Sequence, residues 1–241
     1  MAPSLAHVRK KQYLCNDFGA KPSPKPVVNL HQTPHTMKQN METKPSALPE
    51  RILYLCTCVA WAAKGDLEHL ETAVPQALNH GVTINELKDA FAQLYAYAGF
   101  PRSLNALGVL EKILNAKMVN GTLSLGTWQW GKPFVRPAVW DDAAEALRTG
   151  TAMQKRDEGG TPWDYTFCPQ ADYYMKSHLF GDIYASDQLT PAVRELVTVA
   201  ALSAMDGVTP QFEGHKECAV FMGNTPEQVA ELCRRLEKHI K

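Results

Sequence analysis

The hydrophobic positions of this chain fall into two helical regions separated by a segment rich in glycine, proline and tryptophan. Residues 52–63 are apolar nearly all round, which predicts a buried helix that ends near Gly65. Further helices are predicted over residues 66–78, 86–98 and 102–116, because apolar side chains recur there at helical spacing. These four helices place the first helical region within residues 47–116.

Residues at the helix ends support this division. Asp66 is expected to cap the second helix, and Thr83 with Glu86 forms the pattern of a capping box at the start of the third. Gly99 and Pro101 are expected to break the chain between the third and fourth helices.

The second helical region, residues 168–241, echoes the first. Helices are predicted over residues 172–180, 194–205, 210–221 and 225–241, the first of them ending at Gly181. The run Gly81-Val82-Thr83 of the first region matches Gly223-Asn224-Thr225 of the second. We therefore expect an all-α fold built from an internal duplication of a helical unit, with two tandem degenerate repeats.

Two segments lack helical periodicity over most of their length. Residues 1–46 are rich in proline and polar side chains, which predicts an extended or disordered N-terminal arm. Residues 117–167 carry many glycines and prolines and most of the tryptophans, and only residues 141–149 suggest a short helix. We interpret this segment as a connection between the two helical regions.

Composition narrows the classes of function. The chain has 25 Lys and Arg against 25 Asp and Glu, and a zero net charge argues against nucleic acid as the main partner. No run approaches the ~20 apolar residues that span a bilayer, and the N-terminus does not resemble a secretory signal. The six scattered cysteines are expected to be reduced thiols of a cytoplasmic protein, with Cys56 and Cys58 acting as small buried hydrophobes.

The most informative polar pair lies in the second region. Glu195 lies near the start of an apolar helix, and His215 in the next helix has Phe212 and Ala219 at helical spacing, so its side chain is expected to face inward. If the two helices pack antiparallel, the carboxylate can hold the imidazole and raise its basicity, as proton transfer near pH 7 requires. The alternative is a solvated glutamate and a core histidine without a chemical role.

Both regions resemble the carboxymuconolactone decarboxylase family, within the alkylhydroperoxidase D-like fold. In the first region the resemblance lies in GDLE at 65–68, GVTINELK at 81–88 and YAYAGFPRSLNAL at 95–107. In the second it lies in KSHLFGDI at 176–183, RELVTVAAL at 194–202 and PQFEGH at 210–215. The resemblance implies a tandem two-domain, all-helical protein that self-associates as a trimer or hexamer.

The resemblance also exposes departures. Redox members of this fold use a glutamate, a Cys-x-x-Cys pair and a histidine four residues beyond the second cysteine. Glu195 and His215 fit the outer positions, but Val208 and Gln211 stand where the two thiols belong. Thiolate chemistry at those positions is lost, and Cys218, one turn beyond His215, is the remaining candidate thiol.

The missing thiols favour the decarboxylase-like branch of the family. Its named reaction removes carbon dioxide from an unsaturated lactone acid and leaves a dienolate that must be protonated on carbon. By resemblance we expect a cofactor-free lyase or isomerase that acts on a small anionic substrate and needs no metal. His215 is the expected proton donor or acceptor and Glu195 its orienting partner.

Two further residues are candidates for this site. His178 is a second candidate acid, unless it only interacts with a helix C-terminus. Arg102 is a candidate for binding the substrate carboxylate, unless it makes a structural hydrogen bond at a helix start.

Two other functions stay open. One is a thiol peroxidase or disulfide reductase that depends on Cys218. The other is a non-catalytic helical assembly protein, because Ala73 stands at the first-region position that matches His215.

Overall fold

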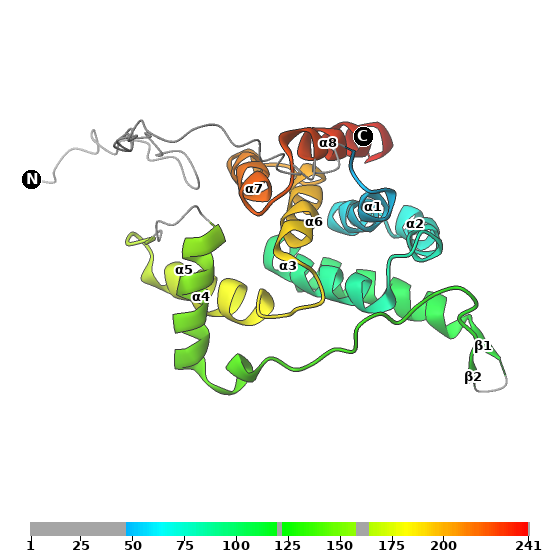
Figure 1. Ribbon diagram of the computed structural model, residues 1–241, viewed down its shortest axis with the longest axis horizontal. Helices are drawn as coiled ribbons and strands as arrows, with labels where there is room; N and C mark the ends of the chain where they lie inside the picture. Colours follow the sequence, from blue (N-terminus) through cyan, green and yellow to red (C-terminus); the bar gives the residue numbers. More distant parts are fainter. Residues whose placement is uncertain (1–46, 120–121, 158–163, 241) are drawn as a thin grey trace, which may run out of the picture.

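The computed structural model describes residues 47–119, 122–157 and 164–240, and the fold is all-α apart from one small hairpin (Figure 1). The expected all-α class is therefore confirmed. The N-terminal arm predicted for residues 1–46 lies outside the described residues. The elements are α1 (Glu50–Lys64), α2 (Leu67–Asn79), α3 (Ile84–Asn115), β1 (Met118–Val119), β2 (Thr122–Leu123), η1 (Ala138–Asp141), α4 (Ala143–Asp157), α5 (Pro169–Tyr174), η2 (Met175–Ile183), α6 (Pro191–Ser203), α7 (Thr209–Phe221) and α8 (Pro226–Ile240).

The helix ends of the first repeat agree with the sequence prediction. Gly65 closes α1 in the left-handed conformation, with φ of 83°. The Asp66 side chain accepts a hydrogen bond from the His69 amide at 3.1 Å and so caps α2. Thr83 and Glu86 form the expected capping box at the start of α3. Local side chains therefore fix where α2 and α3 begin.

The break expected at residues 99–101 is a kink inside one long helix. Gly99 has φ of 79° and ψ of 163°, and α3 continues in a new direction beyond it. Pro101 falls in the first turn of the second part of α3, where its missing amide hydrogen removes no helical hydrogen bond.

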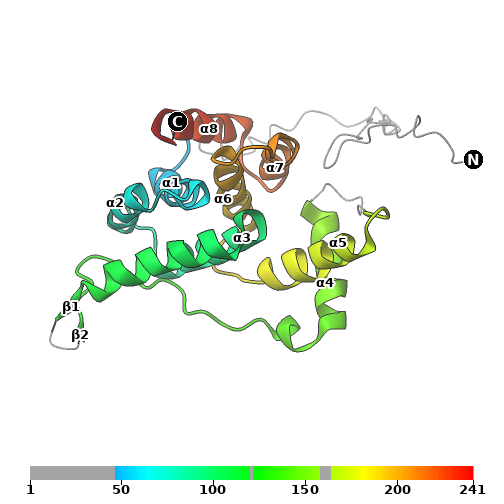
Figure 2. The same cartoon turned by 180° about the vertical axis from the view of Figure 1, so that it is seen from behind.

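Helix α6 lies at the centre of the molecule. It contacts α1 and α3 of the first repeat and α7 and α8 of the second, as Figure 2 shows from behind. Every residue of α6 from Arg194 to Leu202 is buried. One hydrophobic core contains side chains of both repeats, so the two repeats pack as one body.

The described part of the segment between the repeats contains more helix than the sequence predicts. The short helix expected over 141–149 is instead the longer α4, preceded by η1. The helix expected to end at Gly181 continues through Ile183 as the π-helical turn η2, so that predicted terminus is wrong. A Cβ at Gly150 would overlap the backbone of Lys176, and one at Gly181 would overlap that of Ala146. Gly181 therefore permits close packing of α4 on η2 and does not end the helix.

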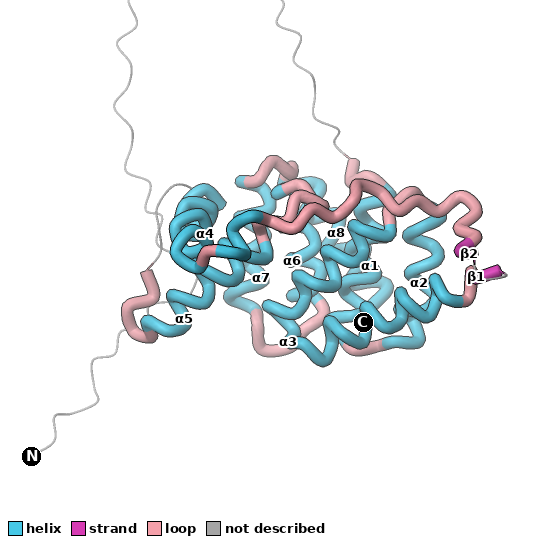
Figure 3. The backbone as a smooth tube through the Cα atoms, turned by 90° about the horizontal axis from the view of Figure 1, so that it is seen from below, coloured by secondary structure: helices cyan, strands magenta, loops and turns pink. Residues whose placement is uncertain are grey.

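The small hairpin and the α4–α5 pair lie at opposite ends of the molecule (Figure 3). The hairpin pairs Met118 with Leu123 and Val119 with Thr122, and strands this short leave no sequence pattern. Trp128, which follows the hairpin, is buried and donates its indole hydrogen to Asn79 Oδ1 at 2.7 Å. Within the described ranges, no helix combines the length and the apolar content needed to cross a bilayer.

Candidate functional site

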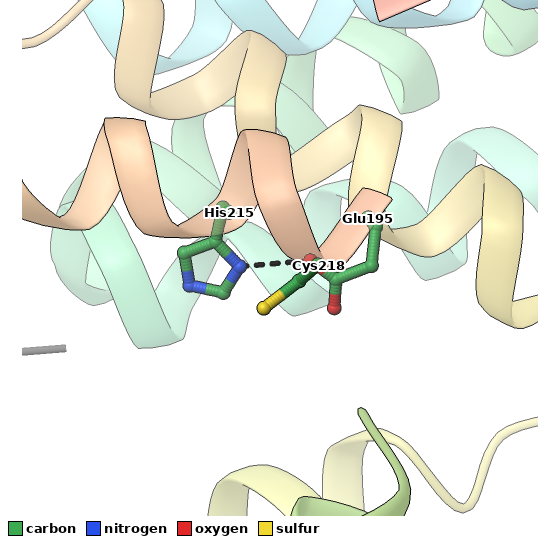
Figure 4. A group of neighbouring side chains, drawn as sticks. All are labelled: Glu195, His215 and Cys218. Carbon is green, nitrogen blue, oxygen red and sulfur yellow. Dashed lines mark hydrogen bonds and ion pairs between the residues drawn. The ribbon is translucent and has the colours of Figure 1, made fainter. Parts of the chain in front are cut away.

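Glu195 and His215 meet between α6 and α7. His215 Nδ1 lies 2.8 Å from Glu195 Oε2, as the dashed line in Figure 4 marks. The Glu195 side chain is 3% exposed and that of His215 is 16% exposed. A charged carboxylate buried to this degree needs hydrogen-bonding partners, and the imidazole supplies one. The structure thus brings together the two side chains that the helical spacing paired.

Two tyrosine hydroxyls complete the surroundings of this pair. The Tyr184 hydroxyl donates to Glu195 Oε1 at 3.4 Å and lies 2.9 Å from the Tyr97 hydroxyl. The Tyr97 ring meets the His215 ring edge-on, with 5.6 Å between ring centroids. Burial, together with the nearby charge of Glu195, raises the pKa of both phenols, so both hydroxyls stay protonated. They are hydrogen-bond donors throughout the physiological range.

Sequence reasoning missed both tyrosines. Tyr97 lies on α3, inside the stretch 95–107 that carries part of the family resemblance. Its position in that stretch was the one sequence signal that could have pointed to it. Tyr184 comes directly after η2, and only the tertiary packing brings its hydroxyl to α6.

A buried arginine network holds α6 against α3 beside the pair. Arg194 is 2% exposed, and its guanidinium donates to Gln93 Oε1 at 2.7 Å, Asp89 Oδ2 at 2.8 Å and the Ser186 carbonyl oxygen at 2.8 Å. Gln93 in turn donates to Thr198 Oγ1 at 2.7 Å. Since Glu195 directly follows Arg194, this network fixes the part of α6 that presents the carboxylate.

Cys218 joins the Glu195–His215 pair. Its sulfur, a carboxylate oxygen of Glu195 and a ring nitrogen of His215 all lie within 4.8 Å of one another. Cys218 follows His215 by three residues on α7, so both side chains face the same side of that helix (Figure 4). The thiol therefore lies with the Glu195–His215 pair, whereas Val208 and Gln211, where the resemblance would place two thiols, carry none.

The other two candidates have surroundings of their own. His178 Nδ1 lies 2.8 Å from Asp182 Oδ2 within η2, and the histidine side chain is 45% exposed. Arg102 lies on α3 after the kink, where its Nε is 3.7 Å from the position of a Cβ at Gly65. The structure thus places His178 beside Asp182 and Arg102 beside the turn between α1 and α2, and their roles stay predictions.

A cavity of about 280 Å³ lies between α4, the loop after η2 and the start of α6, and neither Glu195 nor His215 is among its lining residues. Tyr184 lines this cavity and also touches Glu195, so it connects the two. Arg156 and Arg194 line the wall together with Asp157 and Asp187, and Asp157 accepts a hydrogen bond from Arg156 Nε at 2.6 Å. Burial and, more weakly, the charge of Glu195 raise the pKa of Asp157.

Comparison with models of protein families identifies the family to which the chain belongs. The model of the carboxymuconolactone decarboxylase family matches residues 32–112 and 169–237, which is more than half of the 241 residues. This chain belongs to the carboxymuconolactone decarboxylase family. The two matched segments fit its two helical repeats, so it is a tandem member of the family. A search of curated proteins finds no match to this chain.

The two repeats of this family member are not equivalent. Glu195 and His215 both lie in the second matched segment. Counting along the two repeats predicts Leu53 or Tyr54 on α1 at the position of Glu195, and Ala73 on α2 at the position of His215. Leu53 and Ala73 are buried core residues. The first repeat therefore supplies scaffold and Tyr97, and the second supplies the ionisable pair.

Proposed function

We propose that this carboxymuconolactone decarboxylase-like protein is an acid/base catalyst acting on a small anionic lactone or another enolisable acid. One observation carries the proposal: the 2.8 Å contact between His215 Nδ1 and a glutamate that is 3% exposed. A carboxylate on Nδ1 fixes the imidazole tautomer and leaves Nε2 as the nitrogen that exchanges a proton with substrate.

In the proposed reaction, the bond between a substrate carbon and its carboxylate breaks. Carbon dioxide leaves, and the bonding electrons pass into a dienolate conjugated with the lactone carbonyl. His215 then delivers one proton to carbon, and water returns a proton to the imidazole. The protonated hydroxyl of Tyr184 donates to Glu195 Oε1, and that of Tyr97 lies 2.9 Å from the Tyr184 hydroxyl, so the two phenols hold the carboxylate that orients His215.

The adjacent cavity supports a small, negatively charged substrate. Its volume of about 280 Å³ lies at the lower end of ligand sites, which usually measure roughly 300–1,000 Å³. Arg156, which is 48% exposed and pairs with Asp157, lines it, and a guanidinium suits a carboxylate in shape and charge. Tyr184 lines the cavity and contacts Glu195, so it is the side chain through which a substrate in the cavity would adjoin the pair.

The position of Cys218 favours a second candidate function, a thiol-dependent peroxidase. His215 would take the thiol proton, and the thiolate would attack a hydroperoxide, giving a sulfenic acid and an alcohol. Two equivalents of an external thiol would then restore Cys218 and form a disulfide. The supporting observation is the grouping of its sulfur with the Glu195 and His215 ligand atoms within 4.8 Å.

The deciding experiment measures carbon dioxide release from a panel of carboxylated unsaturated lactones. We expect wild type to turn over one of them, and His215→Ala to lose about 100-fold or more, the usual contribution of a positioned acid or base. His239→Ala removes an exposed histidine of α8 and should leave the rate unchanged. Full activity in a folded His215→Ala variant would overturn the assignment.

Cys218→Ser separates the two candidate functions. The lyase proposal predicts that this variant keeps its carbon dioxide release, because sulfur takes no part in the proton transfer. The peroxidase proposal predicts that it loses thiol-driven peroxide consumption. His178→Ala, measured on the same substrate, tests whether that histidine is a second acid.

A further inference from the structure

Three different donor atoms converge between α6 and α7. Glu195 offers a carboxylate oxygen, His215 a ring nitrogen and Cys218 a thiol sulfur, and these atoms lie within 4.8 Å of one another (Figure 4). Zinc binds thiolate sulfur at about 2.3 Å and imidazole nitrogen or carboxylate oxygen at about 2.0–2.2 Å, so tetrahedral ligand atoms lie roughly 3.3–3.7 Å apart. Zinc binding would require side-chain rotations that bring the three donors, now within 4.8 Å of one another, to that spacing.

We propose that Glu195, His215 and Cys218 form a binding site for a thiophilic divalent cation, with Zn²⁺ as its preferred ion. Three protein ligands with a fourth position left to water are typical of exchangeable or catalytic zinc. Calcium and magnesium select all-oxygen ligand sets, so the thiolate and imidazole argue against both.

The surroundings have the support that a metal site needs. His215 and Cys218 are three residues apart on one face of α7, and Glu195 faces them from α6. The Tyr184 hydroxyl donates to Glu195 Oε1, while His215 contacts Oε2, so one oxygen is oriented while the other is directed at the site. Such outer contacts tune metal affinity about 10- to 100-fold.

Metal binding at this site would regulate the chemistry proposed above. Zinc would occupy the imidazole and carboxylate that handle the proton, so it should inhibit turnover. Binding itself does not depend on the proposed function, but the inhibition does. Because the thiol and the imidazole must lose their protons to bind metal, affinity should fall as the pH is lowered.

Cobalt is the probe for the binding test. Co²⁺ added to the full-length, metal-stripped protein should give a thiolate-to-cobalt charge-transfer band and the visible bands of tetrahedral cobalt, and Zn²⁺ should remove both. Cys218→Ser should lose the charge-transfer band. Cys233→Ser, which removes another partly buried thiol, should keep it. A wild-type protein without the bands, or bands that survive in Cys218→Ser, would overturn the metal site.

Zinc affinity gives a second measurement. Removing a direct ligand should weaken zinc binding more than removing an outer contact does. Glu195→Gln and His215→Ala should therefore each weaken Zn²⁺ binding more than about 100-fold. His239→Ala should bind zinc as wild type does. Unchanged affinity in both ligand variants would contradict the site.

A footprint on the unmodified chain covers the case in which a variant does not fold. Zn²⁺ should protect Cys218 from alkylation by iodoacetamide and leave Cys233 unprotected, as read by mass spectrometry. Equal labelling of Cys218 with and without zinc would refute the proposal. If the wild type binds no cobalt and His215→Ala still abolishes carbon dioxide release, the metal site falls and the proposed function stands. If the wild type shows the cobalt bands and a folded His215→Ala variant keeps its carbon dioxide release, the proposed function falls and the metal site stands.

Discussion

Replacing Arg194 with methionine tests whether the buried network holds α6 in place. The Arg194 side chain is 3% exposed and that of its partner Asp89 is 11% exposed. The substitution leaves the Asp89 carboxylate and the Gln93 amide oxygen without their guanidinium donor. Removing one partner of a buried ion pair costs about 3–5 kcal/mol. Since Asp89 retains some access to water, we expect the free energy of unfolding to fall by about 3 kcal/mol.

Urea denaturation followed by circular dichroism measures this loss. The matched control is Arg51→Met, because Arg51 pairs with Glu86 at 2.6 Å but is 38% exposed. An ion pair of this kind contributes about 0–1 kcal/mol. A second substitution, Asp89→Asn, should recover part of the stability lost in Arg194→Met, since it removes the stranded charge. If the free energy of unfolding of Arg194→Met lies within about 1 kcal/mol of that of wild type, the proposed role of the network is refuted.

Three further predictions follow from packing and burial. Gly150→Ala drives a Cβ into the backbone of η2, so its melting temperature should fall, whereas Gly108→Ala, with nothing within 4 Å, should hold or raise it. Asp157 has a raised pKa, so the stability it contributes when protonated is lost as the pH rises through that pKa. Asp157→Asn should therefore raise the melting temperature near neutral pH, and this gain should shrink as the pH falls toward 3.8, the ordinary pKa of the carboxyl group. A gain that is the same at every pH would contradict this. Burial raises the pKa of the Cys56 and Cys58 thiols, so mass spectrometry should find both unlabelled by iodoacetamide until urea unfolds the protein.

The sequence predicted the helix ends correctly where side chains close in the sequence fix them. Asp66, Thr83 and Glu86 cap their helices through side chains a few residues away, so their pattern is visible in the sequence. Gly181 misled the prediction because a glycine that ends a helix and a glycine that admits a neighbouring backbone look alike. The contact with Ala146 that distinguishes them arises only when α4 packs on η2.

The site was partly predictable for the same reason. Helical spacing directed His215 inward and placed Cys218 on the same face, and the apolar helix around Glu195 implied a buried partner. The hydroxyls of Tyr97 and Tyr184 come from segments far from α7 in the sequence, and only the packing of both repeats into one core unites them. Contacts of that kind leave no periodic pattern to read.

Hydrogen exchange at substrate carbon tests the central claim most directly, because it reports proton transfer alone. The product lactone of the reaction would be incubated with protein in D₂O, and proton NMR would follow loss of the hydrogen next to the carbonyl. With Glu195 holding His215, wild type should accelerate this exchange, and His215→Ala should lose about 100-fold or more of that acceleration. Equal exchange by wild type and a folded His215→Ala variant would contradict the account.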